Sequence, residues 1–536
     1  MIDSNKKRHR LRIIIPAHAA FNIYSYIARV TTALGPVAVA TAVNEMEGWD
    51  VEVIDENNYR RHGPRTDEGR VDHEFLQNLR PADVVGFYGG LTSTVPRLYE
   101  LTRFYKQKGC ITIAGGQHFS DENVIPEAFD SGIDYLVLGE GEEVIKHILR
   151  ALENKDDLGK VNGIAYRVEG KIIKTPAQPQ IVDFDRLPLP DFSLVRYAKI
   201  RLYPIGRIRG CGMDCEFCTV KGRPRCASPE RIIAQISSLV ETRDARHFFI
   251  VDDLFGQQRD ETVRFCHMLR DYQQKISTRL NLSVQIRLDK AGDSELLLAM
   301  RQAGINSVAI GYESPIDEEL AAMNKRLKAE DMVKLTKIYR KFGFLVHGMF
   351  IFGYPKQEGI NFHISPKERI RRYREFIRKA GIDTIQVLLP IPLPGTEFRQ
   401  RLKQQNRIYP LECVGWQYYD GNFPLFEPDE PMTAEELQDS VRQIMGRFYQ
   451  FQYIFMIALN IFSFTTMIFY LHDIQEGWRR WYRNWRNHLI RFIGWLTIKG
   501  WMKSFKKDNF LEKLGLAKQR LKKNQDSRSS TPQKPA

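Results

Sequence analysis

Arg209-Gly-Cys-Gly-Met-Asp-Cys-Glu-Phe-Cys-Thr219 is the most informative stretch of this chain, because it places Cys211, Cys215 and Cys218 in a C-x3-C-x2-C spacing. Three thiolates within eight residues can hold one face of a metal centre. Soft thiolate ligands select zinc, copper(I) or iron–sulfur centres. Structural zinc sites and ordinary iron–sulfur sites use four protein ligands. This run supplies three, so a 4Fe–4S cluster would keep one iron open to an outside molecule. The alternative is a zinc knuckle or three unrelated thiols.

Short apolar runs alternate with helical patterns around and after the cysteines. Buried strands are expected at 202–208, 247–253, 282–287, 307–313, 346–352 and 384–389. Six strand–helix units predict a partial TIM-type barrel over residues 201–405, with the cysteine loop after its first strand. Catalytic groups of such barrels lie at the carboxyl ends of the strands. The polar residues that fall at these ends are Asp252, Asp253, Arg287, Asp289, Glu313 and Tyr354.

This cysteine spacing, placed after the first strand of a barrel, resembles the radical S-adenosylmethionine (SAM) superfamily. In that family the open iron binds the amino and carboxylate groups of SAM, and an electron from the cluster cleaves SAM to a 5′-deoxyadenosyl radical. The resemblance implies that the metal ligands, and the catalytic residues, are Cys211, Cys215 and Cys218. It also implies adenine contacts from an aromatic residue beside the last cysteine and from a glycine-containing strand end, namely Phe217, Gly353 and Tyr354.

Four charged side chains at the strand ends are candidates for binding the polar parts of SAM. Arg287 is expected to pair with the SAM carboxylate, because a guanidinium matches a carboxylate bidentately. Glu313 is expected to accept hydrogen bonds from the ribose hydroxyls or the ammonium group, and Asp252 and Asp253 are assigned to the same cofactor site. Two alternatives stay open: Arg287 and Glu313 form a salt bridge with each other, and the two aspartates only cap loops.

The first part of the chain, residues 11–155, has its own strand–helix alternation. Strands are expected at 11–16, 49–55, 83–88, 110–114 and 135–138, with helical segments between them. This order predicts a doubly wound, Rossmann-like parallel sheet, whose ligands lie beyond the carboxyl ends of the strands. Glycines permit close approach of a ligand to the backbone there. The glycines at these ends are Gly89, Gly90, Gly115, Gly116, Gly139 and Gly141.

This first region resembles the cobalamin-binding domain that precedes many radical SAM domains. The similar segments are Leu34-Gly-Pro36, Val53-Ile-Asp55 and Gly139-Glu-Gly-Glu142. The D-x-H-x-x-G signature, whose histidine ligates cobalt, is absent from the sequence, and His62 and His118 lie outside any such pattern. The resemblance therefore implies cobalamin held without that histidine. The alternative is a Rossmann domain that has lost the corrin.

The carboxyl-terminal region changes in composition. Residues 451–471 carry no charge over 21 residues, a length that can cross a bilayer, although polar residues interrupt the stretch. Tryptophans then alternate with Arg and Lys between 478 and 501, which is typical of a helix lying on anionic lipid. Peripheral contact with a membrane is favoured. One alternative is an apolar helix pair packed on the barrel. The other is contact with nucleic acid, which the lack of a visible RNA-binding module disfavours.

The totals are consistent with several domains in a reducing compartment. The chain has 536 residues, a formal net charge of +14 and seven cysteines, too few for a disulfide framework. The charged start lacks a secretory signal pattern, so a cytoplasmic location is expected, with membrane association on the cytoplasmic face. The expected divisions are a basic leader (1–10), the Rossmann-like domain (11–155), a connector (156–200), the barrel (201–405), a helical region (406–515) and a disordered tail (516–536).

Both resemblances together imply a cobalamin-dependent radical SAM enzyme that transfers a methyl group to an unactivated carbon. The membrane-like segment points to a hydrophobic or lipid-like substrate. A reductase, ferredoxin or flavodoxin is the expected electron donor, and nucleic acid is not an expected partner. Two alternatives stay open. The enzyme performs a radical oxidation, C–C bond formation or cyclisation without methyl transfer, or the protein is a non-catalytic corrinoid or iron–sulfur sensor at the membrane.

Overall fold

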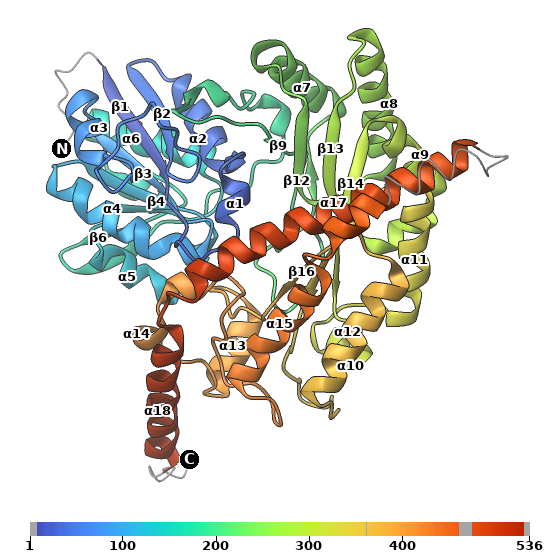
Figure 1. Cartoon of the computed structure of the whole chain (residues 1–536). Helices are drawn as coiled ribbons and strands as arrows, with labels where there is room; N and C mark the ends of the chain where they lie inside the picture. The colour runs from blue at the N-terminus through green and yellow to red at the C-terminus, as the bar shows by residue number, and fades with distance from the viewer. Residues whose placement is uncertain (1–7, 361, 460–473, 530–536) are drawn as a thin grey trace.

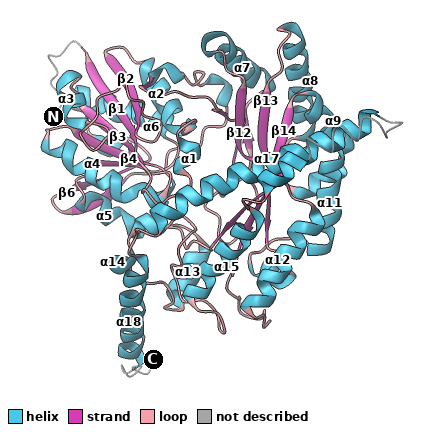
Figure 2. Ribbon diagram, viewed as in Figure 1, coloured by secondary structure: helices cyan, strands magenta, loops and turns pink. Residues whose placement is uncertain are grey.

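The computed structural model describes residues 8–360, 362–459 and 474–529. Two α/β units lie next to each other, and the long helix α17 (Ile474–Phe505) crosses both (Figure 1). Figure 2 shows the two sheets as separate groups of strands, each flanked by helices. The predicted class, a Rossmann-like domain followed by a partial barrel and a helical carboxyl-terminal region, is confirmed.

The first unit is built on an eight-stranded sheet in the order β7-β6-β5-β4-β3-β1-β2-β8. Its strands are β1 (His9–Ile15), β2 (Trp49–Asp55), β3 (Val84–Tyr88), β4 (Ile111–Gly115), β5 (Tyr135–Val137), β6 (Ile164–Val168), β7 (Lys171–Lys174) and β8 (Val195–Arg196). The first five strands pair in parallel and are almost wholly buried, because helices cover both faces of the sheet. These helices are α2 (Leu34–Asn44), α3 (His73–Leu79), α4 (Val95–Gln107), α5 (Ile125–Asp130) and α6 (Gly141–Asn154).

The segment 156–200, predicted to be a connector, contributes three strands to this sheet. β6 and β7 form an antiparallel hairpin that extends the sheet from β5. β8 pairs with β2 at the other edge. Most of the connector is therefore part of the first unit, because its apolar residues complete the sheet edges. The predicted leader is also shorter than expected: β1 begins at His9, and residues 1–7 lie outside the described part of the chain.

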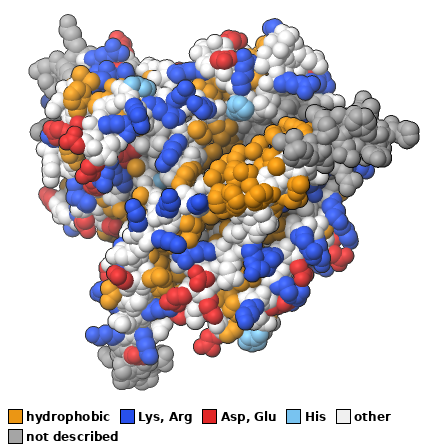
Figure 3. All heavy atoms as spheres, in the orientation of Figure 1, with side chains coloured by type: hydrophobic (Ala, Val, Ile, Leu, Met, Phe, Trp, Pro, Cys, Tyr) orange, Lys and Arg blue, Asp and Glu red, His pale blue; other side chains and the backbone are white. Residues whose placement is uncertain are grey.

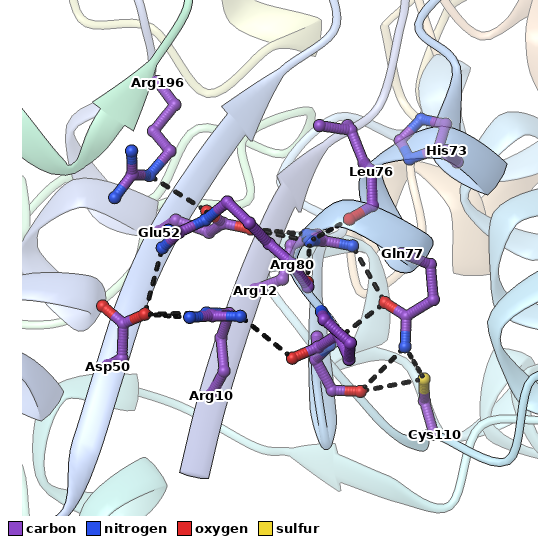
Figure 4. A network of polar contacts seen from close by, with 12 residues as sticks. Arg10, Arg12, Asp50, Glu52, His73, Leu76, Gln77, Arg80, Cys110 and Arg196 are labelled. Carbon is purple, nitrogen blue, oxygen red and sulfur yellow. Dashed lines mark hydrogen bonds and ion pairs between the residues drawn. The ribbon is translucent and has the colours of Figure 1, made fainter. Parts of the chain in front are cut away.

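A buried carboxylate holds several arginines in the first sheet (Figure 4). Glu52 on β2 is 1% exposed and lies 2.8 Å from Arg12, 2.8 Å from Arg80 and 3.0 Å from Arg196. Arg12 is itself fully buried and also donates to Gln77 at 3.0 Å. A buried guanidinium needs a carboxylate and further acceptors to offset its desolvation. This network ties β1 and β2 to α3.

The second unit is a six-stranded, all-parallel sheet in the order β16-β15-β14-β13-β12-β9. The strands are β9 (Tyr203–Ile205), β12 (His247–Phe255), β13 (Asn281–Ile286), β14 (Ile305–Glu313), β15 (Leu345–Ile351) and β16 (Thr384–Leu388). The connecting helices are α7 (Pro229–Arg243), α8 (Arg259–Lys275), α9 (Ser294–Gln302), α10 (Asp317–Ala322), α11 (Ala329–Lys341) and α12 (Pro366–Ala380). Neighbours in the sheet are consecutive in the chain, as a partial barrel requires.

The first barrel strand is shorter than the predicted 202–208. It ends at Ile205, and the chain continues into β10 (Ile208–Arg209), which pairs with β11 (Arg225–Cys226) in a separate antiparallel ribbon. The reason is the buried Asp252, whose Oδ1 accepts from the backbone nitrogens of Arg207 at 2.6 Å and Ile208 at 2.9 Å. These bonds draw the chain away from the sheet, so the cysteine loop projects from the β10–β11 ribbon.

The carboxyl-terminal helices pack on both units. They are α13 (Glu397–Gln404), α14 (Leu411–Val414), α15 (Ala434–Phe448), α17 and α18 (Phe510–Ser529). A capping box formed by Thr433 and Glu436 opens α15. Asn487 of α17 donates to Asp383 beside the barrel at 2.6 Å, and Trp501 donates to the backbone of Phe21 in the first unit. α17 therefore fastens the two units together.

The prediction that the tail 516–536 is disordered is corrected by the structure. α18 continues to Ser529, and residues 530–536 lie outside the described residues. Its apolar residues recur at helical spacing and are buried in a cluster that also contains Tyr418 and Phe423 of the segment before α15; they are Phe510, Leu514, Ala517 and Leu521. Their packing outweighs the polar composition of the segment. Of the uncharged stretch 451–471, the structure describes 451–459, and none of the described helices is both long and apolar enough to span a membrane.

Candidate active site between the sheet and the cysteine loop

A cavity of about 940 Å³ lies at the carboxyl ends of β3, β4 and β5. One wall is the glycine-rich edge of the first sheet together with the start of α2. The other wall comes from the barrel unit and includes Arg209, Gly210, Thr219 and Lys221, which flank the cysteines on both sides. A ligand in the cavity would therefore touch both the first unit and the base of the cysteine loop.

Most of the predicted glycines line this cavity, namely Gly90, Gly115, Gly116, Gly139 and Gly141. Gly89 lies outside the lining, against the ring of Phe119. At Gly116 a Cβ would stand 2.6 Å from the backbone of Gly89, and φ is +126°, so only glycine allows these two loops to meet. Gly35, in the Leu34-Gly-Pro36 segment, also lines the cavity, and only Tyr88 lies near its Cβ position, at 4.0 Å.

The donor groups of this wall fit a corrin. Side-chain amides are present at Gln117, Gln178, Gln180 and Gln235, and they can pair with the carboxamide chains at a corrin edge. None of the described residues that line the cavity is a histidine. His118 lies buried against Trp416, with the ring centroids 4.9 Å apart, and burial lowers its pKa to about 3. The wall therefore suits a corrin bound through its edge rather than through a cobalt–histidine bond.

The three cysteines of the motif are free and half-buried on one loop. Burial is the largest cause that raises the pKa of each thiol, and in Cys215 and Cys218 the charge of a neighbouring thiolate of the motif raises it further. A metal is therefore needed to keep all three as thiolates. Among the described residues no group converges tightly enough for a single metal ion. A cubane cluster does not require this, because each thiolate binds a different iron.

Two of the predicted cofactor residues shape the loop instead. Asp252 is 3% exposed and binds the backbone before the loop, and burial raises its pKa to about 6. Asp253 accepts from the backbone nitrogen of Gly210 at 2.6 Å, although it also lines the cavity. The loop-capping alternative therefore describes Asp252, which does not line the cavity, and describes Asp253 in part. Gln257, not predicted, donates to the carbonyl of Cys211 at 3.1 Å and also fixes the loop.

Arg287 and Glu313 do not pair with each other. Arg287 pairs with Asp289 and donates to the sulfur of Met213, inside the cysteine motif, at 2.8 Å. Glu313 pairs with Lys325 at 2.6 Å and has a left-handed backbone, with φ of +60°. Such a backbone costs about 1–3 kcal/mol and occurs preferentially at functional sites. Both predicted residues thus border the cysteine loop, and Lys325, which has no sequence signal of its own, joins them.

Gly353 and Tyr354, which are predicted to contact adenine through their strand end, have close packing on their other sides. Tyr354 is 1% exposed, and its hydroxyl donates to Glu216 at 2.5 Å. Phe217 meets the Tyr354 ring edge-on, with the centroids 6.2 Å apart. At Gly353 a Cβ would stand 2.2 Å from Leu437 of α15. The two residues therefore form the core beneath the cysteine loop, because helices outside the barrel strand cover them.

Glu216, between the second and third cysteines, was missed by the sequence analysis. It is 4% exposed and receives two hydrogen bonds from Arg401 of α13, at 2.5 and 2.9 Å. An arginine that binds a carboxylate bidentately fixes its geometry. This pair anchors the cysteine loop to the helix that follows the barrel. No spacing in the sequence links residues so far apart.

Comparison with known proteins matches each of the two units to a protein family. A model of the radical SAM superfamily matches residues 205–363, and a model of the B12 binding domain matches residues 25–149. The chain is 26% identical over 397 residues to the anaerobic magnesium-protoporphyrin IX monomethyl ester cyclase of Rubrivivax gelatinosus, covering 70% of this chain and 67% of that protein. It is 25% identical over 443 residues to an uncharacterized methyltransferase of Pyrococcus horikoshii, covering 79% and 90%. The hopanoid C-2 methylase of Rhodopseudomonas palustris is 25% identical over 42% of each chain.

Solved structures show the same fold. The radical SAM methyltransferase TsrM of Kitasatospora setae, with cobalamin and a [4Fe-4S] cluster bound, superposes with a TM-score of 0.63 at 17% identity, covering 90% of this chain and 99% of that one. The cobalamin-dependent radical enzyme OxsB, with aqua-cobalamin and SAM bound, gives a TM-score of 0.63 at 15% identity, covering 97% and 84%.

The chain therefore combines a radical SAM domain with a B12-binding domain. Its cofactors are accordingly a 4Fe–4S cluster, SAM and cobalamin, as the cysteine motif and the first domain predict.

Proposed function

We propose that this enzyme transfers a methyl group to an unactivated carbon of a hydrophobic or lipid-like substrate in the cytoplasm. The single observation that carries the proposal is the cavity that joins the glycine edge of the first sheet to the base of the cysteine loop. A corrin and a SAM-bound cluster would therefore be neighbours. The names of several relatives, a hopanoid C-2 methylase among them, support methyl transfer.

When bound, the cluster and SAM supply a radical that removes hydrogen from carbon, and cobalamin supplies a methyl group. The residues of this chain hold and orient these groups. The three cysteines are the proposed cluster ligands, and Arg287, beside Met213, is positioned to bind the SAM carboxylate. Glu313 and Lys325 offer an acceptor and a donor at the next strand end. The glycine wall allows the corrin to approach the backbone.

The same cofactors can also support oxidative cyclisation, and one relative is named as a cyclase over 70% of this chain. Either reaction requires one electron at a time from a reductase, ferredoxin or flavodoxin-type donor. A non-catalytic sensor would bind the cofactors without cleaving SAM, and would tolerate loss of Arg287 and Glu313.

The decisive experiment is anaerobic. The protein is reconstituted with iron, sulfide and hydroxocobalamin, then given dithionite, methyl-labelled SAM and a total lipid extract. We expect 5′-deoxyadenosine together with label in a lipid fraction, both absent from a Cys215→Ala variant. Deoxyadenosine with bound corrin but oxidised, unlabelled lipid would favour the cyclase-type reaction. A full cluster that yields no deoxyadenosine would refute an enzymatic role.

We further propose that the enzyme docks on anionic membranes through an apolar face on α17 and the residues before it. This face consists of Phe455, Leu459, Tyr482, Ile493 and Leu496, whose exposed fractions are 46–61% (Figure 3). Lys499 and Lys503 on the same helix are exposed. Residues 474–507 contain nine Lys and Arg against a single acidic residue. An apolar face beside cations matches an anionic lipid interface, at about 1 kcal/mol per cation.

The alternative that the apolar helices only pack on the barrel explains the buried side of α17, but not its exposed side. Asn487, Trp501 and Phe505 are buried against the protein, whereas the apolar face remains uncovered within the described residues. Flotation with vesicles of phosphatidylglycerol tests the contact. Ile493→Asp with Leu496→Asp should abolish flotation, whereas Leu298→Asp, a similarly exposed leucine on α9, should not. Equal flotation of both variants, or of wild type with purely zwitterionic vesicles at high salt, would refute an anionic lipid surface.

A further inference from the structure

Both ends of the cysteine loop are held by one glutamate of the first unit. Arg209 of β10 and Arg225 of β11 face each other across the ribbon from which the loop projects. Arg225 binds Glu140 bidentately, with 2.9 Å from each terminal nitrogen to a carboxylate oxygen. Arg209 lies 3.1 Å from the same carboxylate and also pairs with Glu142. The chain leaves for the cysteines after Arg209 and returns at Arg225, so Glu140 fastens both ends.

The two arginines also share an aromatic support. The Phe184 ring centroid lies 4.9 Å from the guanidinium carbon of Arg209 and 5.4 Å from that of Arg225. Phe184 is buried, so it limits the movement of both side chains. Planar guanidinium groups that are stacked and bound bidentately have little rotational freedom. The link between Glu140 and the ribbon is therefore rigid.

Glu140 is equally fixed to the corrin wall. It lies between Gly139 and Gly141, all three line the cavity, and its Oε2 accepts from the backbone nitrogen of Ile181 at 2.8 Å. Burial alone would raise the pKa of Glu140, but the hydrogen bonds of Arg225 and Ile181 and the charge of Arg209 bring it below the usual value. The group is thus a carboxylate at neutral pH. A ligand that binds against this part of the wall therefore contacts the segment that holds Glu140.

We propose that Glu140 is a positioning residue that couples cobalamin binding in the cavity to the placement of the cysteine loop, so that cobalamin and SAM bind cooperatively. The inference rests on the cofactors of the proposed function and adds a link between their two sites. A corrin that orders the segment around Glu140 also orders both ends of the loop, which lowers the cost of SAM binding there. By linkage, SAM strengthens cobalamin binding by the same factor.

The test compares Glu140→Gln with Glu143→Gln, a change of the same kind on α6 at a residue that pairs with Lys146. Hydroxocobalamin is titrated by absorption into cluster-loaded protein with and without SAM. In the wild type, SAM should tighten cobalamin binding at least about fivefold, the lower end of typical coupling. The ratio should fall to one in Glu140→Gln and stay at the wild-type value in Glu143→Gln.

A second measurement needs neither cofactor. Amide hydrogen exchange over 210–224 should be faster in Glu140→Gln than in the wild type and unchanged in Glu143→Gln. A wild type that binds both cofactors without coupling, or a Glu140→Gln protein that keeps the coupling and the slow exchange, would overturn the inference and leave the proposed function standing. A wild type that binds no cobalamin would instead overturn the proposed function.

Discussion

Replacing Gly35 with phenylalanine should remove cobalamin binding while leaving the fold intact. Gly35 is the second residue of α2 and lines the cavity, and the atom nearest to a Cβ built there is Cε2 of Tyr88 at 4.0 Å. Its φ is not in the left-handed region, so the backbone does not require glycine there, and the strain that a Cβ adds is the crowding against the ring of Pro36. The new ring must then extend into the open volume that the corrin is proposed to fill.

The substitution should affect the stability of the protein and its affinity for cobalamin in opposite directions. Glycine in a helix is about 1 kcal/mol worse than alanine, and phenylalanine is intermediate, so the free energy of unfolding should rise by roughly 0.5 kcal/mol or stay constant. Overfilling a packed site costs about 1–3 kcal/mol, which lowers affinity about 5- to 150-fold. Cobalamin binding should therefore weaken by at least fivefold with no loss in the thermal midpoint.

The assay is titration with hydroxocobalamin followed by absorption, alongside thermal unfolding. Gly515→Phe is the matched control, because Gly515 also lies in a helix with nothing within 4 Å of its Cβ position, but on α18 outside the cavity. Wild-type affinity in Gly35→Phe would show that the corrin does not occupy this cavity. A large drop in thermal midpoint would show that the space around Gly35 is smaller than the structure indicates.

Three further results are expected. Glu52→Gln leaves three arginines without their buried carboxylate and should lower the free energy of unfolding of the first unit by about 3–5 kcal/mol. Arg196→Gln changes a partner that is 40% exposed and should lower it by less than about 1 kcal/mol, as measured by thermal unfolding. Equal losses of stability in the two variants would contradict the network. Burial raises the pKa of Asp420 to about 7, so its contribution to stability is full below about pH 4, the range of a free aspartate, and is lost as pH rises to about 7. Asp420→Asn should therefore remove a fall in thermal midpoint between about pH 4 and 7, and an unchanged fall in the variant would contradict this assignment. Glu216→Gln should weaken the hold of Arg401 on the cysteine loop, so iron loss to a chelator should speed up several-fold; an unchanged rate would separate this pair from the cluster.

Much of the fold follows from short-range patterns in the chain. Apolar runs between helical segments predict both parallel sheets. Strands of the first sheet, such as β1 and β2, are buried on both faces, whereas barrel strands such as β13 and β15 alternate between buried and less buried residues. The failures have local causes in three dimensions. The strand expected at 202–208 is divided because Asp252, distant in sequence, binds the backbone of Arg207 and Ile208. α18 is helical because its apolar residues pack against the segment that contains Tyr418 and Phe423, which composition alone does not reveal.

The site divides in the same way. The spacing of Cys211, Cys215 and Cys218 and the glycines at the strand ends are sequence properties, because a metal loop and a ligand-binding edge need particular residue types at short spacing. What holds the loop in place comes from residues far along the chain, such as Glu140 and Arg401. Their roles depend on buried charge pairs, and a pair across so many residues exists only once the two units and the last helices have packed together.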